Sequence, residues 1–203
     1  MNIFEIQQSR QDKEFVLKNG SLEFEVFADI LKTAEDIPYI GSLFKLGKVV
    51  LNYMDYCFVR KLHYFLAESE NIEPEKKEKF FNSLDEKDYK RINAMMTQLL
   101  YTADEDGKAT LIGKIYRSRL MGDIDDEMML RLSSVVNRAF LSDLEHLEEY
   151  VKPNPKGNYI TSNLYSFGLL QLKGPEVVET TLIVDRQYEV NEVGKLLMRI
   201  MRE

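Results

Sequence analysis

The sequence contains little cysteine and histidine, which limits the chemistry that it can support. Its 203 residues include one cysteine, Cys57, and two histidines, His63 and His146. A single cysteine excludes an internal disulfide bond and is typical of a protein of the reducing cytoplasm. Cys57 and His63 are six positions apart, which on a helix separates them by roughly 240°, so they cannot form a local catalytic dyad. We therefore expect a cytoplasmic protein with an inert core thiol.

The sequence also lacks long apolar runs and an excess of basic residues. Its longest run without a charged residue, between Lys156 and Lys173, is interrupted by several polar side chains, whereas a membrane-spanning helix needs about 20 mostly apolar residues. The formal net charge of −7 argues against general affinity for nucleic acid or anionic membranes. No basic segment followed by an apolar run stands at the start, so we expect no signal peptide.

Catalytic and metal-binding motifs are missing as well. No glycine-rich loop follows a predicted strand, and no serine lies in a nucleophile-elbow pattern. A calcium loop around Asp104–Gly107 would have Thr102 at its first position and Gly113 at its twelfth, where a bidentate glutamate is required. His146 is three residues from Glu149, a spacing that suits a metal, but the acids there belong to a solvated helix face. We expect no enzymatic activity, no cofactor and no metal site.

Apolar residues at helical spacing dominate the first three quarters of the chain. The stretch from Leu43 to Leu66 is apolar nearly all round, which predicts a helix buried on most sides. The alternative is a membrane-active helix over residues 37–66, which five charged side chains in the stretch disfavour. The segment Ser83–Glu86 predicts a capping box that opens a further helix. Residues 1–20 are polar, and residues 21–151 are predicted to form an α-helical bundle.

The composition changes at residues 152–158, KPNPKGN, where prolines and glycine predict a linker or long turn. Beyond it, the pattern predicts the order helix, strand, turn, strand, helix. The predicted elements are a helix over 162–172 that turns at Gly168, strands over 177–184 and 188–190, and a last helix capped by Asn191. The fold is therefore predicted to be mainly α, a multi-helix bundle with a small C-terminal α+β module, residues 152–203, packed on the bundle.

Two strings in this module resemble a known family. Residues 164–170, LYSFGLL, and residues 188–197, YEVNEVGKLL, resemble the second half of a winged-helix domain of the MarR or PadR kind, although Asn191 stands where that family usually has threonine. The resemblance implies a winged-helix-like module and, as an alternative function, a transcriptional regulator. DNA readout needs basic side chains on the reading helix, but residues 159–172 contain no Lys or Arg. We expect no nucleic-acid binding by the isolated protein.

The helical part carries a second resemblance, in two acidic turns. Residues 103–107, ADEDG, and 121–127, MGDIDDE, each precede an amphipathic helix and are similar to turns of the tellurite-resistance TerB-like proteins. The first turn lacks a following acid in register, so the paired signature is incomplete. The overall layout is also similar to uncharacterised helical proteins of phages and mobile elements. Whether the acids at 104–106 and 123–127 bind a metal stays open from the sequence.

A module of about fifty residues cannot cover all the apolar surface that its strand and last helix offer. We expect the surplus to pack on the bundle, on a second copy or on a protein partner. The expected function is that of an adaptor or regulator that binds another protein, and the mobile-element resemblance implies a role in phage–host conflict, as defence or counter-defence. The expected interaction surface comprises Leu164, Phe167, Leu169, Leu182, Val184, Leu197, Ile200 and Met201.

Overall fold

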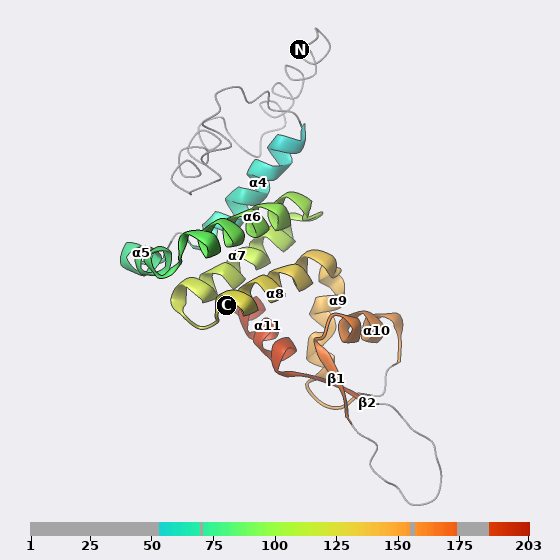
Figure 1. The fold of residues 1–203 in the computed structure, drawn as a ribbon. Helices are drawn as coiled ribbons and strands as arrows, with labels where there is room; N and C mark the ends of the chain where they lie inside the picture. Colours follow the sequence, from blue (N-terminus) through green and yellow to red (C-terminus); the bar gives the residue numbers. More distant parts are fainter. Residues whose placement is uncertain (1–52, 70, 155–156, 174–186) are drawn as a thin grey trace, which may run out of the picture. The chain divides into compact units, whose positions relative to one another are not determined.

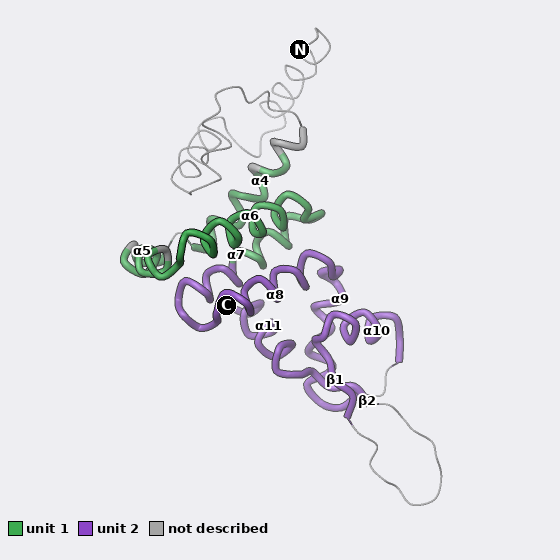
Figure 2. The backbone as a smooth tube through the Cα atoms, in the orientation of Figure 1, with its two compact units in different colours: residues 1–113 green, residues 114–203 purple. Residues whose placement is uncertain are grey.

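A computed structural model describes residues 53–69, 71–154, 157–173 and 187–203 (Figure 1). Most of these residues are helical, and a two-stranded antiparallel sheet lies near the C-terminus, so the predicted mainly α fold with a small β element is confirmed. The chain divides into two compact units, 1–113 and 114–203 (Figure 2). Residues on both sides of position 151, where the sequence predicts a domain boundary, lie in the second unit.

The first unit contains helices joined by short turns. They are α4 (Tyr53–Ala67), α5 (Pro74–Ser83), α6 (Glu86–Thr102) and the first half of α7 (Asp106–Met121). The helix α5 begins at its proline, where the missing N–H group would have no helical partner in any case. Among the described residues, the structure contains no helix with the length and apolar character of a membrane span.

The described part of helix α4 is buried or half-buried at most positions. Phe58, Leu62 and Phe65 are buried and α4 packs against α6, whereas Tyr64 on the same helix is exposed. The predicted burial on most sides of the 43–66 stretch stays a prediction, because residues 43–52 lie outside the described residues. Tyr64 shows that an aromatic side chain with a polar tip is tolerated at the surface. Residues 37–52, which the membrane-active alternative also requires, lie outside the described residues.

Helix α6 begins at a different cap from the predicted one. Asp85 is the N-cap, and its carboxylate accepts a hydrogen bond of 2.7 Å from the Asp88 amide. The Ser83 hydroxyl donates back to the Phe80 carbonyl at 2.6 Å, within the last turn of α5. The predicted capping box is wrong because the serine hydroxyl satisfies the end of one helix and leaves the start of the next to the aspartate.

The second unit combines short helices with the sheet. Its elements after α7 are α8 (Asp126–Arg138), α9 (Leu141–Glu145), the 3-10 helix η1 (His146–Tyr150), α10 (Tyr159–Ser166), β1 (Leu170–Lys173), β2 (Gln187–Val190) and α11 (Glu192–Arg202). The predicted cap of the last helix is confirmed, since the Asn191 side chain accepts from the Gly194 amide at 2.9 Å. The order helix, strand, strand, helix is also confirmed in the described residues.

The first strand of the sheet is not where the sequence predicts it. Gly168 has φ +72°, a left-handed conformation that ends α10, and the next residues form β1 instead of continuing the predicted 162–172 helix. β1 pairs antiparallel with β2, Leu170 opposite Val190 and Leu172 opposite Tyr188. The predicted strand 177–184 lies outside the described residues, whereas the predicted strand 188–190 is confirmed within β2.

The C-terminal residues pack on the helices that precede them. The strand β2 and helix α11 both contact η1, and α10 contacts α9. The Tyr150 hydroxyl is buried and hydrogen-bonds the Thr161 hydroxyl at 2.7 Å. A Cβ atom at Gly194 would collide with the Leu169 carbonyl oxygen and the Val190 side chain, so only glycine allows α11 to lie this close to the hairpin.

Candidate interaction surface

Helix α10 presents tyrosine and serine side chains on its outer face. Thr161 and Leu164 on the inner face are almost fully buried, which turns the opposite face outward. Tyr159 is 73% exposed and Tyr165 is 45% exposed. Ser162, like Ser166 in the last turn, is also exposed, and the helix is held at its start by an Asn158 capping box.

The exposed face of α10 continues onto the hairpin. The Tyr165 ring meets the Tyr188 ring edge to face, with centroids 5.7 Å apart. Leu172, 42% exposed, is directly opposite Tyr188 in the sheet, and paired residues of neighbouring strands share one face. Helix and hairpin thus form one continuous surface, called the tyrosine surface below. Its members are Tyr159, Ser162, Tyr165, Leu172 and Tyr188.

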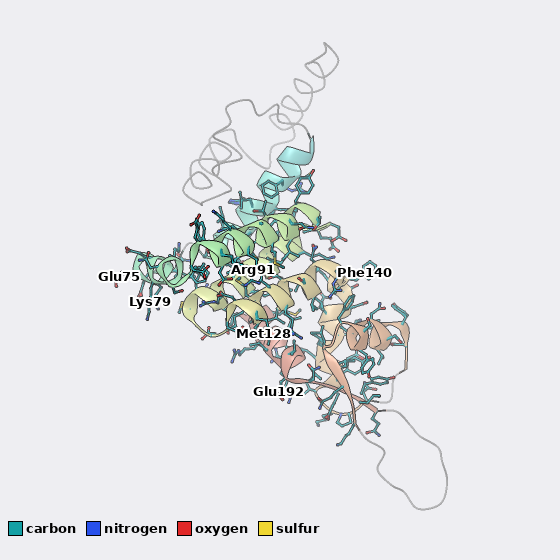
Figure 3. The ribbon with its side chains drawn as sticks, in the orientation of Figure 1. Glu75, Lys79, Arg91, Met128, Phe140 and Glu192 are labelled. Carbon is teal, nitrogen blue, oxygen red and sulfur yellow. The ribbon has the colours of Figure 1, made fainter. Side chains whose placement is uncertain are left out.

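The helical part of the tyrosine surface carries no charge. Residues 157–172, which include all of α10, contain no Asp, Glu, Lys or Arg. Without cations this helix cannot make the phosphate contacts that position a protein on DNA. Exposed tyrosines beside serines are typical of antibody binding loops, where tyrosine offers a large rigid contact area and serine an adaptable hydrogen bond. A further exposed aromatic residue, Phe140, projects from the ribbon at the start of α9 (Figure 3).

The structure distributes the sequence-predicted surface residues differently from the expectation. Phe167 and Met201 are half-buried, and Leu182 and Val184 lie outside the described residues. The other four are almost completely buried within the second unit and are not available at its surface: Leu164, Leu169, Leu197 and Ile200. Within the described residues, the apolar positions of the last helix, Leu197 and Ile200, are therefore core positions of the second unit.

The residues of the tyrosine surface were not predicted, because their pattern in the sequence is less distinctive than the regular apolar spacing of the buried residues. Tyr159 and Tyr165 lie in an eight-residue helix whose apolar positions attract attention to its other face. Leu172 and Tyr188 become neighbours only through the strand register. The available signal was the combination of tyrosines and serines in a stretch without charge.

The first acidic turn, between α6 and α7, uses its carboxylates within the molecule. Asp104 accepts from the buried Lys108 ammonium at 2.7 Å, and Asp106 pairs with Arg60 at 3.1 Å. The hydrogen bond from Lys108 holds the pKa of Asp104 below its ordinary value. The Lys61 ammonium donates to the Tyr101 and Ala103 carbonyls at 2.8 and 2.7 Å, and burial lowers the pKa of Lys61. This turn serves to join α4, α6 and α7.

The second acidic turn is used in the same way. Asp125 is the N-cap of α8 and accepts from the Met128 amide at 2.8 Å. Asp126 pairs with Arg119 at 2.6 Å. Within the described residues, no group of three or more His, Cys, Asp or Glu side chains could hold a metal ion.

The cysteine and histidines occupy separate surroundings. Cys57 is half-buried on α4, and the His63 ring lies beside that of Tyr64, with centroids 5.7 Å apart. The Nδ1 atom of His146 is 2.6 Å from a carboxylate oxygen of Glu149 on the exposed side of η1. This histidine and glutamate therefore make a surface pair within a single turn.

The chain matches no protein-family model, no curated protein and no solved structure. The resemblances to winged-helix and TerB-like proteins therefore stay predictions. The candidate site rests on the exposure of its residues, on the strand register and on the lack of charge.

Proposed function

We propose that this protein acts by binding another protein through the tyrosine surface. The observation that carries the proposal is the exposure of Tyr159 and Tyr165 on a helix without charged residues, continued by Tyr188 and Leu172 on the hairpin. Large exposed apolar side chains that touch one another cost solvation free energy in the free protein. A partner that covers them removes this cost, and tyrosines are among the residues that contribute most to binding energy at interfaces.

The chemistry of the surface limits the kind of partner. Without a charge on α10, association gains little from electrostatic steering, so the partner is recognised by shape, apolar contact and neutral hydrogen bonds. The tyrosine and serine hydroxyl groups can donate to and accept from backbone groups of a folded protein. The resemblance to proteins of phages and mobile elements suggests a partner from a phage or its host, and an adaptor or regulator is the role that we propose.

The test compares two tyrosines of similar exposure. Tyr165 is 45% exposed on the tyrosine surface, and Tyr101 is 48% exposed on α6 in the other unit. The full chain and its Tyr165→Ser and Tyr101→Ser variants are used for quantitative co-purification from the native host. Each protein recovered is then produced alone and titrated against all three chains. We expect a partner whose affinity falls at least about tenfold with Tyr165→Ser and stays unchanged with Tyr101→Ser.

Three results would contradict the proposal. The first is equal loss of affinity in both variants, and the second is a partner that binds the Tyr165→Ser chain as tightly as the wild type. The third is sequence-selective DNA binding by the full chain in gel shifts near physiological salt, which would favour the winged-helix regulator instead. Light scattering identifies a second copy of the chain as the partner if Tyr165→Ser abolishes a dimer.

A further inference from the structure

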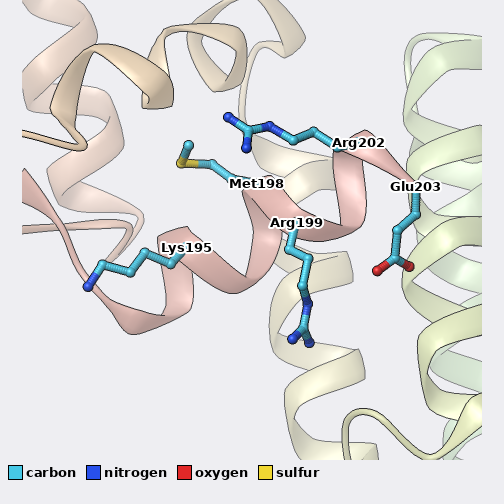
Figure 4. A pocket seen from close by; sticks show the side chains of 5 residues that line it. All are labelled: Lys195, Met198, Arg199, Arg202 and Glu203. Carbon is cyan, nitrogen blue, oxygen red and sulfur yellow. The ribbon is translucent and has the colours of Figure 1, made fainter.

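The outer face of α11, in the second unit, carries three basic side chains. Lys195, Arg199 and Arg202 are exposed and spaced four and three residues apart, so they share one side of the helix. With Met198 and Glu203 they line an open hollow of about 370 Å³. Lys195 and Glu203 lie at opposite ends of this face, with Met198, Arg199 and Arg202 between them (Figure 4). We call these five residues the α11 basic face.

Two of the three cations already bind carboxylates. Arg202 donates to Glu148 at 2.7 Å, and Lys195 donates to Glu192 at 2.7 Å. Arg199, between them in sequence, is exposed and makes no hydrogen bond or ion pair with the part of the chain that the structure describes. The pairs show that carboxylates fit this face, and Arg199 is left with its five N–H donors for an external acceptor.

The existing ion pairs do not close the face to a ligand. The side chains of Arg202 and Glu148 are each 63% exposed, and ion pairs of this exposure contribute little to stability. A carboxylate from outside can therefore replace Glu148 or bind beside it at low cost. Met198 adds an apolar floor, and the aliphatic stems of the arginines extend it.

We propose that the α11 basic face binds an acidic peptide segment of a partner protein. One carboxylate of the segment binds Arg199, a second reaches Arg202 or Lys195, and an apolar side chain packs against Met198. Glu203 repels acids at its end of the hollow and so directs the acidic residues toward Lys195. The chain itself has a net charge of −7, which repels long polyanions such as nucleic acids more strongly than a short segment with few carboxylates. None of these residues belongs to the tyrosine surface, so the proposal stands apart from the proposed function.

The test uses a short fluorescent peptide in which glutamates flank a leucine, titrated against the full chain by anisotropy at low salt. Matched peptides replace the glutamates with glutamine or the leucine with serine. Arg199→Glu is the test variant, and Arg131→Glu is the control, because Arg131 is an exposed arginine of α8 paired with Glu127. Both variants change the net charge equally. We expect Arg199→Glu to weaken binding at least about tenfold more than Arg131→Glu, and added salt to weaken binding by the wild type.

The outcomes are distinguishable. Binding that depends on the glutamates, on the leucine and on Arg199 supports the proposal. Equal loss in the two arginine variants would mean that only net charge matters and would overturn it. Competition by inorganic phosphate as strong as by the peptide would overturn the choice of a peptide ligand, and no measurable binding by the wild type at low salt would overturn the proposal entirely. Unfolding curves confirm that both variants are folded.

Discussion

The turn between α6 and α7 and the outer face of α10 treat their polar groups in opposite ways. At the turn, Asp104 and Asp106 bind Lys108 and Arg60, and Lys61 bonds two backbone carbonyls. The face of α10 has no charge and exposes tyrosines to solvent. The turn uses its polar side chains to hold helices together, whereas the large side chains on the outer face of α10 stay exposed to solvent.

This difference separates structural from functional surface better than polarity alone does. Acidic residues at a turn attract a metal-binding or catalytic interpretation. Here, however, Asp104 and Asp106 each pair with a basic side chain of the same unit. Neutral tyrosines attract no such interpretation, yet Tyr159 and Tyr165 are exposed on α10, and this exposure is what our proposal of a protein partner rests on. If the comparison is correct, substitutions around the turn reduce stability, and substitutions on α10 reduce binding with little effect on stability.

The largest effect is expected inside the first unit. Phe58→Asp places a charge at a buried position of α4, and an unpaired buried charge costs several kcal/mol. We expect loss of cooperative unfolding in circular dichroism. Tyr64→Asp, at an exposed position of the same helix, is the control and should unfold near the wild-type temperature. A stable Phe58→Asp variant would show that this face of α4 is accessible.

The next effect concerns the buried lysine near the turn. Lys61→Met keeps the apolar stem but removes the ammonium that binds the Tyr101 and Ala103 carbonyls. Leaving such acceptors unsatisfied costs about 1–3 kcal/mol, which urea unfolding would measure. Lys87→Met, at an exposed position of α6, is the control. Equal midpoints for the two variants would show that Lys61 is no more structural than a surface lysine.

A smaller effect is expected on the tyrosine surface. Tyr165→Ser removes an edge-to-face contact with Tyr188, and such contacts contribute about 0.5–1.5 kcal/mol. We expect the unfolding midpoint to fall less than with Lys61→Met. A larger fall would mean that Tyr165 is part of the core of the second unit, and the contrast between the two regions would then fail.

Local rules predicted much of the fold correctly. The cap at Asn191 follows from a single-residue preference, and the structure contains it. The predicted turn at Gly168 is also a real change of direction, but its left-handed backbone ends α10 instead of lying within a longer helix. Ser83 was assigned the wrong role because serine can bond either the helix behind it or the one ahead. The strand β1 was missed because its pairing with β2 is non-local, and pairing decides whether a short apolar run becomes strand or helix.

The site was harder to predict than the fold. Leu164 and Leu197 are apolar at regular spacing, and such spacing shows that a face is covered without showing what covers it. The structure covers both within the second unit. The contact of Tyr165 with Tyr188 joins a helix and a strand 23 positions apart in the sequence, and no local pattern encodes such a contact. Surface function of this kind depends on tertiary packing, so it emerges only with the fold.

The smallest effect tests whether the acidic turn is structural. The hydrogen bond from Lys108 lowers the pKa of Asp104, so its contribution to stability is present above the ordinary value of 3.8 and is lost as the pH falls through the lower folded-state pKa. Because Asp104 is 61% exposed, we expect Asp104→Asn to cost less than about 1 kcal/mol at neutral pH.

The pH dependence gives this last prediction its sign. Urea unfolding across the acid range should show the Asp104→Asn and wild-type curves converging as Asp104 becomes protonated in the folded state, because the variant lacks only the ionised partner of Lys108. Asp123→Asn controls for the loss of one exposed carboxylate. A difference that persists at the lowest pH would assign the effect to packing of the asparagine. If the wild type instead gains stability relative to Asp104→Asn on acidification, the ionised carboxylate destabilises the folded chain. That result is expected for acids that gather to bind an external cation, and it would contradict the pairing of Asp104 with Lys108.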